Sequence, residues 1–86
     1  MTFETRHPLS IWRLPVVEAE TGHCGSTIYD RIKKGLWPRS VPLGPRAVGW
    51  PAGEVIAMNA ARISGKSDDE IRELVRKIET DRKEMA

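Results

Sequence analysis

The sequence has few of the residues that catalytic, metal or disulfide chemistry needs. Its 86 residues include one cysteine, Cys24, and two histidines, His7 and His23. A lone cysteine excludes an internal disulfide framework, and these three residues do not make a zinc-ligand pattern, so we expect no metal and no cofactor. Cys24 has no general base or orienting group at a recognisable spacing. We therefore expect no catalytic residues and no enzymatic activity.

Long apolar runs are also missing. No stretch approaches the roughly 20 apolar residues that cross a bilayer. The first ten residues, MTFETRHPLS, lack the basic and apolar blocks of a signal peptide. A single cysteine fits a reducing compartment. These features predict a cytoplasmic protein without a membrane partner.

What the chain has instead is a local excess of positive charge. The net charge of the whole chain is +2, but residues 25–50 hold five basic residues and one acid, a net of +4. Residues 51–86 hold seven basic and eight acidic residues, a net of −1. A compact basic unit is typical of a surface that binds nucleic acid, and a merely solvated face is the alternative. The residues concerned are Asp30, Arg31, Lys33, Lys34, Arg39 and Arg46.

The pattern in the first half of the chain predicts two short helices joined by a tight turn. Residues 1–10 have no clear period and predict a flexible arm. Residues 11–14 either begin the core or form a small strand. We expect a first helix over residues 15–21, ended by a glycine, and a second over residues 26–34.

A hairpin and a third helix follow. The apolar residues alternate at 41–43 and 47–50, on either side of the turn 44–46, as the two strands of a half-buried hairpin require. Pro42 lacks a backbone N–H, so it should lie on an edge strand. The spacing of apolar residues then predicts a helix over residues 51–63.

The last helix carries the strongest local signal. Ser67 and Glu70 have the spacing of a capping box, which predicts a helix over residues 67–84. Glutamates four residues before lysines, at 73/77 and 79/83, favour ion pairs on its surface. An apolar stripe either packs back onto the same domain or associates with a second copy of the chain. The stripe consists of Ile71, Leu74, Val75 and Ile78.

Two short helices joined by a glycine-containing turn form a helix-turn-helix pattern, whose second helix is sized for the major groove. We expect Thr27, Arg31 and Lys34 to point outward from that helix. Arg31 is suited to a bidentate contact with a guanine edge. Asp30 either accepts a hydrogen bond from a cytosine amine or pairs with Arg31 or Lys34.

Other basic residues are placed to hold the DNA backbone. Lys33 and Lys34 end the second helix and are expected at phosphates, as is Arg39 just before the hairpin. Pro45 and Arg46 lie in the hairpin turn, where a stiff turn carrying one arginine enters a minor groove or grips backbone.

The aromatic residues allow two interpretations. They are expected to anchor the core of a small domain, with Tyr29 on the buried side of the second helix beside Ile28 and Ile32. Stacking on bases, as in single-strand binders, is the alternative. The residues in question are Trp12, Tyr29, Trp37 and Trp50.

Three segments carry a family resemblance: TGHCGSTIYDRIKKGLWP, LGPRAVGW and EVIAMNAAR. Residues 13–62 resemble the AlpA family of phage-type regulators and the related small excisionases, which have a MerR-like winged helix-turn-helix fold. We therefore predict a mainly α-helical fold with a small β-hairpin. Residues 11–63 would form the winged helix-turn-helix, followed by the C-terminal amphipathic helix over residues 67–84.

The resemblance also implies which residues bind DNA. The positions that match the family's groove helix and wing are Ser26, Thr27, Asp30, Arg31, Lys34, Gly44, Pro45 and Arg46. The turn departs from the family pattern at His23, Cys24 and Gly25, and the third helix departs at Met58-Asn59. Acidic Asp30, where the family is commonly basic or polar, makes the target sequence less predictable.

The function implied is sequence-specific binding to double-stranded DNA in a prophage or another integrative element. Such a protein acts as an excisionase (recombination directionality factor), as a transcriptional regulator, or as both. Its partners would be an attachment-site or promoter region, an integrase, and further copies bound cooperatively on the nucleoid. The alternative is a protein-interaction adaptor that works through its C-terminal amphipathic helix.

Overall fold

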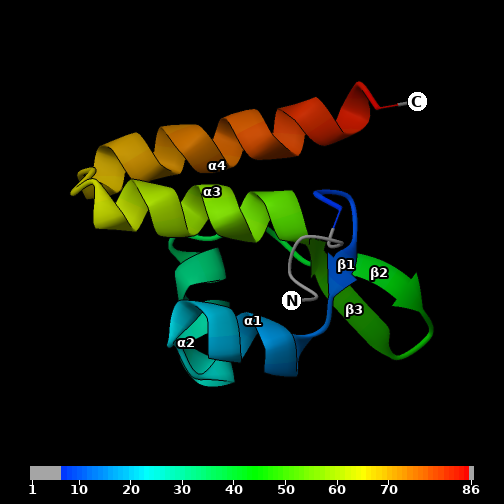
Figure 1. The fold of residues 1–86 in the computed structure, drawn as a ribbon. Helices are drawn as coiled ribbons and strands as arrows, with labels where there is room; N and C mark the ends of the chain where they lie inside the picture. Colours follow the sequence, from blue (N-terminus) through cyan, green and yellow to red (C-terminus); the bar gives the residue numbers. More distant parts are fainter. Residues whose placement is uncertain (1–6, 86) are drawn as a thin grey trace.

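The structure is a computed structural model that describes residues 7–85. Its helices are α1 (Leu14–Thr21), α2 (Gly25–Lys33), α3 (Ala52–Ile63) and α4 (Asp68–Lys83). Figure 1 shows α3 and α4 side by side as one layer, with α1, α2 and the small sheet beneath them. The mainly helical fold with a small antiparallel sheet confirms the predicted winged helix-turn-helix class.

The first helices begin and end within one residue of the prediction. Pro15 lies in the first turn of α1, where its missing N–H costs nothing. Gly22 ends α1 in the left-handed conformation with φ 76°, and its N–H donates to Glu18 O at 2.9 Å. Gly35 follows α2 with φ 75°. Both glycines adopt a backbone conformation that other residues rarely tolerate, so they set the length of each helix.

The sheet has the strand order β1-β3-β2, and both pairs are antiparallel. Its strands are β1 (Ile11–Trp12), β2 (Val41–Gly44) and β3 (Ala47–Pro51). Residues 11–12 thus form the small strand that was one of two alternatives. Pro42 pairs with Val48 on the outer strand β2, which confirms its expected place on an edge.

The three tryptophans anchor the core, as predicted. Trp12, Trp37 and Trp50 are 8%, 3% and 0% exposed. The indole N–H of Trp50 donates to Pro38 O at 2.9 Å, which satisfies its polar group within the core. Tyr29 differs from the prediction because it is 42% exposed, with its ring centroid 6.2 Å from that of Trp50. It lies at the edge of the buried side of α2 rather than inside the core.

Helix α4 packs onto the domain it follows. Ser67 and Glu70 form both hydrogen bonds of the predicted capping box. The apolar stripe of α4 belongs to the same core cluster as the tryptophans. Ile71, Val75 and Ile78 are buried, and Leu74 is partly buried against them. Of the two alternatives for this stripe, the structure therefore shows packing within the domain, and a second copy could reach it only if α4 detached.

The segment before β1 is tied to α3. Ala52 N–H donates to Ser10 O at 2.7 Å and Gly53 N–H donates to Pro8 O at 2.8 Å. The packed domain thus begins earlier than the expected boundary at residue 11. The rest of the expected arm, residues 1–6, lies outside the described residues.

Candidate nucleic-acid interface

The first turn of α2 is held by α1. Glu18 of α1 accepts a hydrogen bond of 2.6 Å from Gly25 N–H, a backbone donor that no earlier turn of the helix can satisfy. A Cβ at Gly25 would lie 3.1 Å from Leu14 Cδ2, so glycine allows the two helices to approach closely. This arrangement fixes the position of α2 relative to the rest of the domain.

The outward side of α2 is polar and exposed. Ser26, Asp30, Lys33 and Lys34 are exposed, while Ile28 on the opposite side is buried. Asp30 Oδ2 lies 2.9 Å from Lys34 Nζ, so the alternative in which Asp30 pairs with Lys34 is the one observed. The hydrogen bond from Lys34 lowers the pKa of Asp30. This surface presents hydrogen-bonding groups and positive charge that suit a DNA groove.

Arg31 does not point outward with these residues. It follows Ile28 by three positions, which places it on the inward flank of the helix. The side chain is half-buried, and its Nε is buried without a hydrogen-bond partner among the described residues. Thr27, on the same flank, is half-buried too. Two of the three residues expected to point outward therefore face the side of α2 where Arg62 of α3 and Arg72 of α4 lie.

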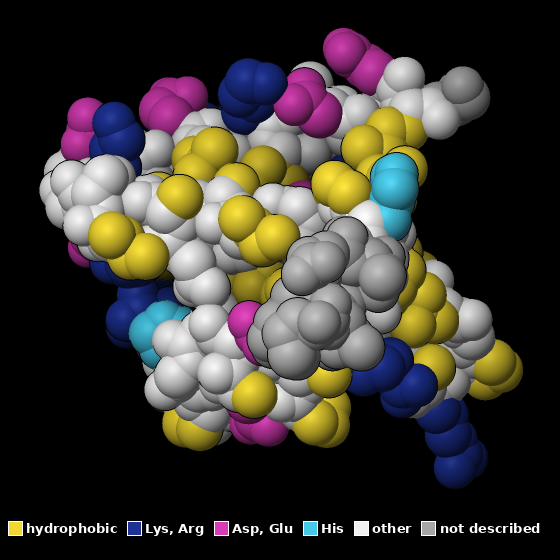
Figure 2. All heavy atoms as spheres, in the orientation of Figure 1, with side chains coloured by type: hydrophobic (Ala, Val, Ile, Leu, Met, Phe, Trp, Pro, Cys, Tyr) yellow, Lys and Arg dark blue, Asp and Glu magenta, His cyan; other side chains and the backbone are white. Residues whose placement is uncertain are grey.

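The hairpin presents the expected turn. Pro45 and Arg46 connect β2 to β3 and are both exposed, as is Gly44 at the end of β2. In Figure 2, Lys and Arg side chains project at the lower right, on the side of the molecule where the hairpin lies. Tyr29 of α2 contacts Trp50 of β3, which places its exposed ring where the helix meets the hairpin.

Arg39 is exposed, but its backbone is anchored to α4. Its N–H donates to Glu79 Oε2 at 2.9 Å, and its carbonyl accepts from Arg82 Nη2 at 2.8 Å. Arg82 also forms a two-point ion pair with Glu54 of α3. One arginine thus joins α3, α4 and the loop between α2 and β2, which sets the position of Arg39.

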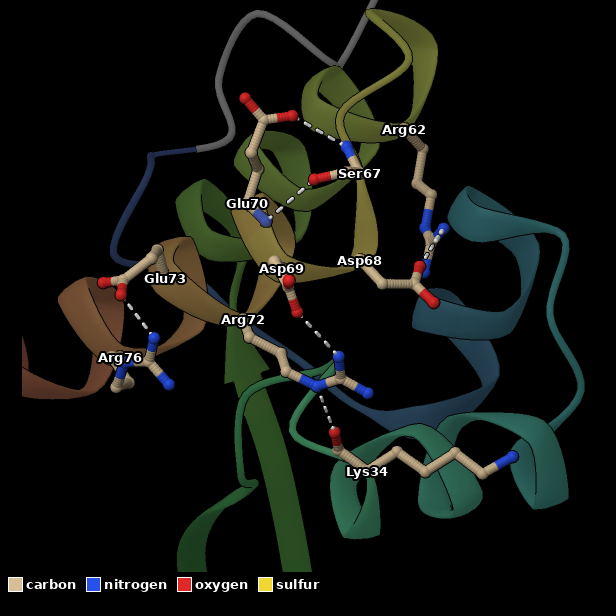
Figure 3. A network of polar contacts seen from close by, with 9 residues as sticks. All are labelled: Lys34, Arg62, Ser67, Asp68, Asp69, Glu70, Arg72, Glu73 and Arg76. Atoms are coloured by element: carbon tan, nitrogen blue, oxygen red, sulfur yellow. Dashed lines mark hydrogen bonds and ion pairs between the residues drawn. The ribbon is translucent and has the colours of Figure 1, made fainter.

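Two basic residues near α2 were missed in the sequence. Arg62 at the end of α3 and Arg72 in α4 line a cleft beside α2 together with Arg31 and Lys34. Arg72 Nε donates to Lys34 O at 2.9 Å (Figure 3). Both arginines lie far from α2 in sequence, and no local spacing signals that they meet it.

Cys24 occupies the N-cap position of α2 and is exposed. Its Sγ lies 3.2 Å from both Ser26 Oγ and Thr27 Oγ1. The hydrogen bonds from Ser26 and Thr27 lower the pKa of the Cys24 thiol to about 7. Within residues 7–85 no group of three His, Cys, Asp or Glu side chains is placed to hold a metal ion. None of the helices described is long and apolar enough to cross a membrane.

The fold and the exposed helix α2 define a protein of the winged helix-turn-helix class. The family model described as Prophage CP4-57 regulatory protein (AlpA) matches residues 10–60, and the chain belongs to this family. The chain is also 44% identical over 54 residues to the uncharacterized protein ORF88 of Enterobacteria phage P4. That match covers 63% of this chain and 61% of the phage protein, which is less than two thirds of that relative's length. No solved structure matches the chain significantly.

Proposed function

We propose that this protein binds double-stranded DNA with α2 in the major groove and the hairpin turn on the adjacent backbone or minor groove. The observation that carries the proposal is the exposed side of α2, where Ser26, Asp30, Lys33 and Lys34 project while the other side is buried. Pro45 and Arg46 extend the contact from the hairpin. Membership of a family of prophage regulatory proteins supports this use of the fold.

The DNA contacts that we propose for the residues of α2 differ from those expected from the sequence. Lys33 and Lys34 at the end of the helix suit phosphates, and Ser26 with Asp30 remain to read base edges. Asp30 is paired with Lys34, and this ion pair must open before Asp30 can accept a hydrogen bond from a base. Arg31 and Thr27 would act from the flank of the helix, and Arg39 from the loop.

The biological role proposed is control of a prophage or another integrative element. The protein would act at an attachment site as an excisionase that positions an integrase, at a promoter as a transcriptional regulator, or at both. In either role it would work on the nucleoid in the cytoplasm, without chemistry of its own. Cooperative binding of several copies would lengthen the short site that one winged unit contacts.

The alternative function, a protein-interaction adaptor, requires an exposed apolar surface on α4. Ile71, Val75 and Ile78 are the apolar residues that would recruit a partner through α4, and all three are buried in the core. The part of α4 that remains exposed is charged, with ion pairs such as Lys77–Asp81 at 2.9 Å.

A mobility-shift titration with duplexes from the element's attachment and promoter regions tests the proposal. If about four basic side chains neutralise phosphates, log K against log salt should have a slope near −3.6. Preference for one region over the other and over a scrambled duplex separates excision from transcriptional control, and a steep binding curve indicates cooperativity. Absence of duplex binding at ~50 mM salt would refute the proposal.

A further inference from the structure

A cleft between the helix-turn-helix turn and α3 gathers positive charge. It is lined by His23 of the turn, Arg31 of α2 and Arg62 of α3, with Glu20 of α1 and Asn59 of α3 beside them. Arg31 and Arg62 also line the neighbouring cleft along α2, which Lys34 and Arg72 share. Figure 3 shows Arg72 extending from α4 to Lys34 at the end of α2, and Arg62 extending from α3 to Asp68 at the start of α4. The two clefts share Arg31 and Arg62 and together form a groove along the flank of α2, which Asp30 and Asp68 line as well.

The charges in this groove are incompletely neutralised. Arg31 forms no ion pair with any described residue, and its Nε is buried without an acceptor. Arg62 has a long ion pair of 3.9 Å with Asp68, which leaves its guanidinium free to accept a closer anion. Both arginines line the cleft, so an anion bound there would accept charge-assisted hydrogen bonds.

We propose that the cleft lined by His23, Arg31 and Arg62 binds a phosphate of the DNA backbone. The phosphate oxygens would accept from the guanidinium groups of Arg31 and Arg62, whose adjacent N–H donors suit a phosphate. This site rests on the proposed function and deepens it, since it assigns Arg31 to backbone and adds Arg62 from α3 to the interface.

The site makes DNA binding depend on pH through His23. Partial burial, together with the positive charges of Arg31 and Arg62, lowers the pKa of His23 in the free protein. The charged groups that line the cleft around it are Glu20 from α1, Arg31 from α2 and Arg62 from α3. A bound phosphate offsets the two arginines and raises the pKa of His23, so binding takes up a proton. Affinity therefore increases as the pH falls through the pKa of the bound state and levels off below that of the free state.

The test follows the His23 imidazole by NMR in the full chain, free, with inorganic phosphate and with duplex DNA. We expect duplex DNA to raise the pKa of His23, and a rise of one unit corresponds to about tenfold tighter binding at low pH. R62Q should abolish most of the rise and reduce the salt slope by about 0.9. R76Q is the matched control, because Arg76 pairs with Glu73 on the exposed side of α4. R62K, which keeps the charge, should retain most of the pH dependence.

The outcomes separate this site from the proposed function. Duplex binding with an unchanged pKa of His23, and with equal salt slopes for the wild type, R62Q and R76Q, overturns the phosphate site and leaves the proposed function intact. A pKa that rises with inorganic phosphate but not with bound duplex assigns the cleft to a free anion and also overturns it as a DNA contact. No duplex binding by any variant at ~50 mM salt overturns both.

Discussion

Glu18 of α1 and Gly25 of α2 are joined by a hydrogen bond of 2.6 Å that caps the second helix from the first. The N-cap residue of α2, Cys24, makes no side-chain capping hydrogen bond. Glu18 supplies instead an acceptor for the free N–H of Gly25, the first residue of the helix. The same contact joins the two helices, so we expect the stability of α2 to depend on this carboxylate.

Removing that carboxylate should weaken the fold. We expect E18A to lower the free energy of unfolding by about 1–2 kcal/mol, because Gly25 N–H loses its acceptor at a partly buried position. E18Q keeps an acceptor oxygen and should retain most of the stability. Urea denaturation measures the free energy of unfolding of both variants. E20A, on the exposed side of α1, is the control. Equal losses for E18A and E20A would contradict the capping role.

The ion pair between Arg82 and Glu54 should matter more than the surface pairs of α4. The side chains of Arg82 and Glu54 are 21% and 11% exposed, and Arg82 also donates to Arg39 O. We expect R82A to lower the free energy of unfolding by about 2–3 kcal/mol, since it leaves a mostly buried carboxylate unpaired. R76A breaks an exposed pair and should cost at most about 1 kcal/mol. Chemical denaturation of the two variants checks the difference, and similar midpoints would contradict it.

Cys24 should react as a thiolate near neutral pH. The Ser26 and Thr27 hydroxyls lower the pKa of its thiol to about 7, so the rate of alkylation by iodoacetamide should reach half its maximum at about pH 7. In the protein unfolded by urea the midpoint should move toward about 8.5, the usual value for cysteine. The double variant S26A/T27V should show the same upward shift while folded. Coincident midpoints for the folded and unfolded wild type would argue against these hydrogen bonds.

Base preference should follow the exposed side of α2 rather than Arg31. We expect D30N to change the ranking of duplex sequences by about 1–3 kcal/mol, because Asp30 is exposed on the outward side of the helix. R31A should instead weaken binding to all duplexes about equally, as expected for a phosphate contact. Competition between randomised duplexes measures both effects. Loss of sequence preference in R31A, with D30N unaffected, would reverse this assignment.

Local sequence patterns predicted the helices and strands well, but they predicted the contacts between side chains less well. Gly22 and the Ser67–Glu70 capping box depend on neighbouring residues, so the sequence located the end of α1 and the start of α4. The ion pairs of α4 were misassigned, because Glu73 pairs with Arg76 and Lys77 with Asp81 where Glu73–Lys77 and Glu79–Lys83 were expected. Several partners are equally close on a charged helix surface, and propensity alone does not choose among them.

The contacts that shape the interface arise from the tertiary fold. Arg82 meets Arg39 across 43 positions of sequence, and Arg72 meets Lys34 across 38. Arg31 shares its clefts with Arg62 of α3 and Arg72 of α4, and the positions of these helices depend on tertiary packing. Periodicity identified Ile28 as buried. It does not show how many residues beside Ile28 the neighbouring helices also cover, because that depends on tertiary packing. For that reason the sequence placed Arg31 outward and gave Arg62 and Arg72 no role.

We expect the exposed end of α2 to contact DNA, and a salt titration of duplex affinity measures this contact. The wild type should show a slope of log K against log salt of about −3.6 or steeper, and K33Q/K34Q should be shallower by about 1.8 because two phosphate contacts are lost. The control K77Q/K83Q removes the same charge from exposed residues of α4 and should keep the wild-type slope. Equal slopes for the two double variants, or no binding by the wild type at low salt, would show that this end of α2 does not contact DNA.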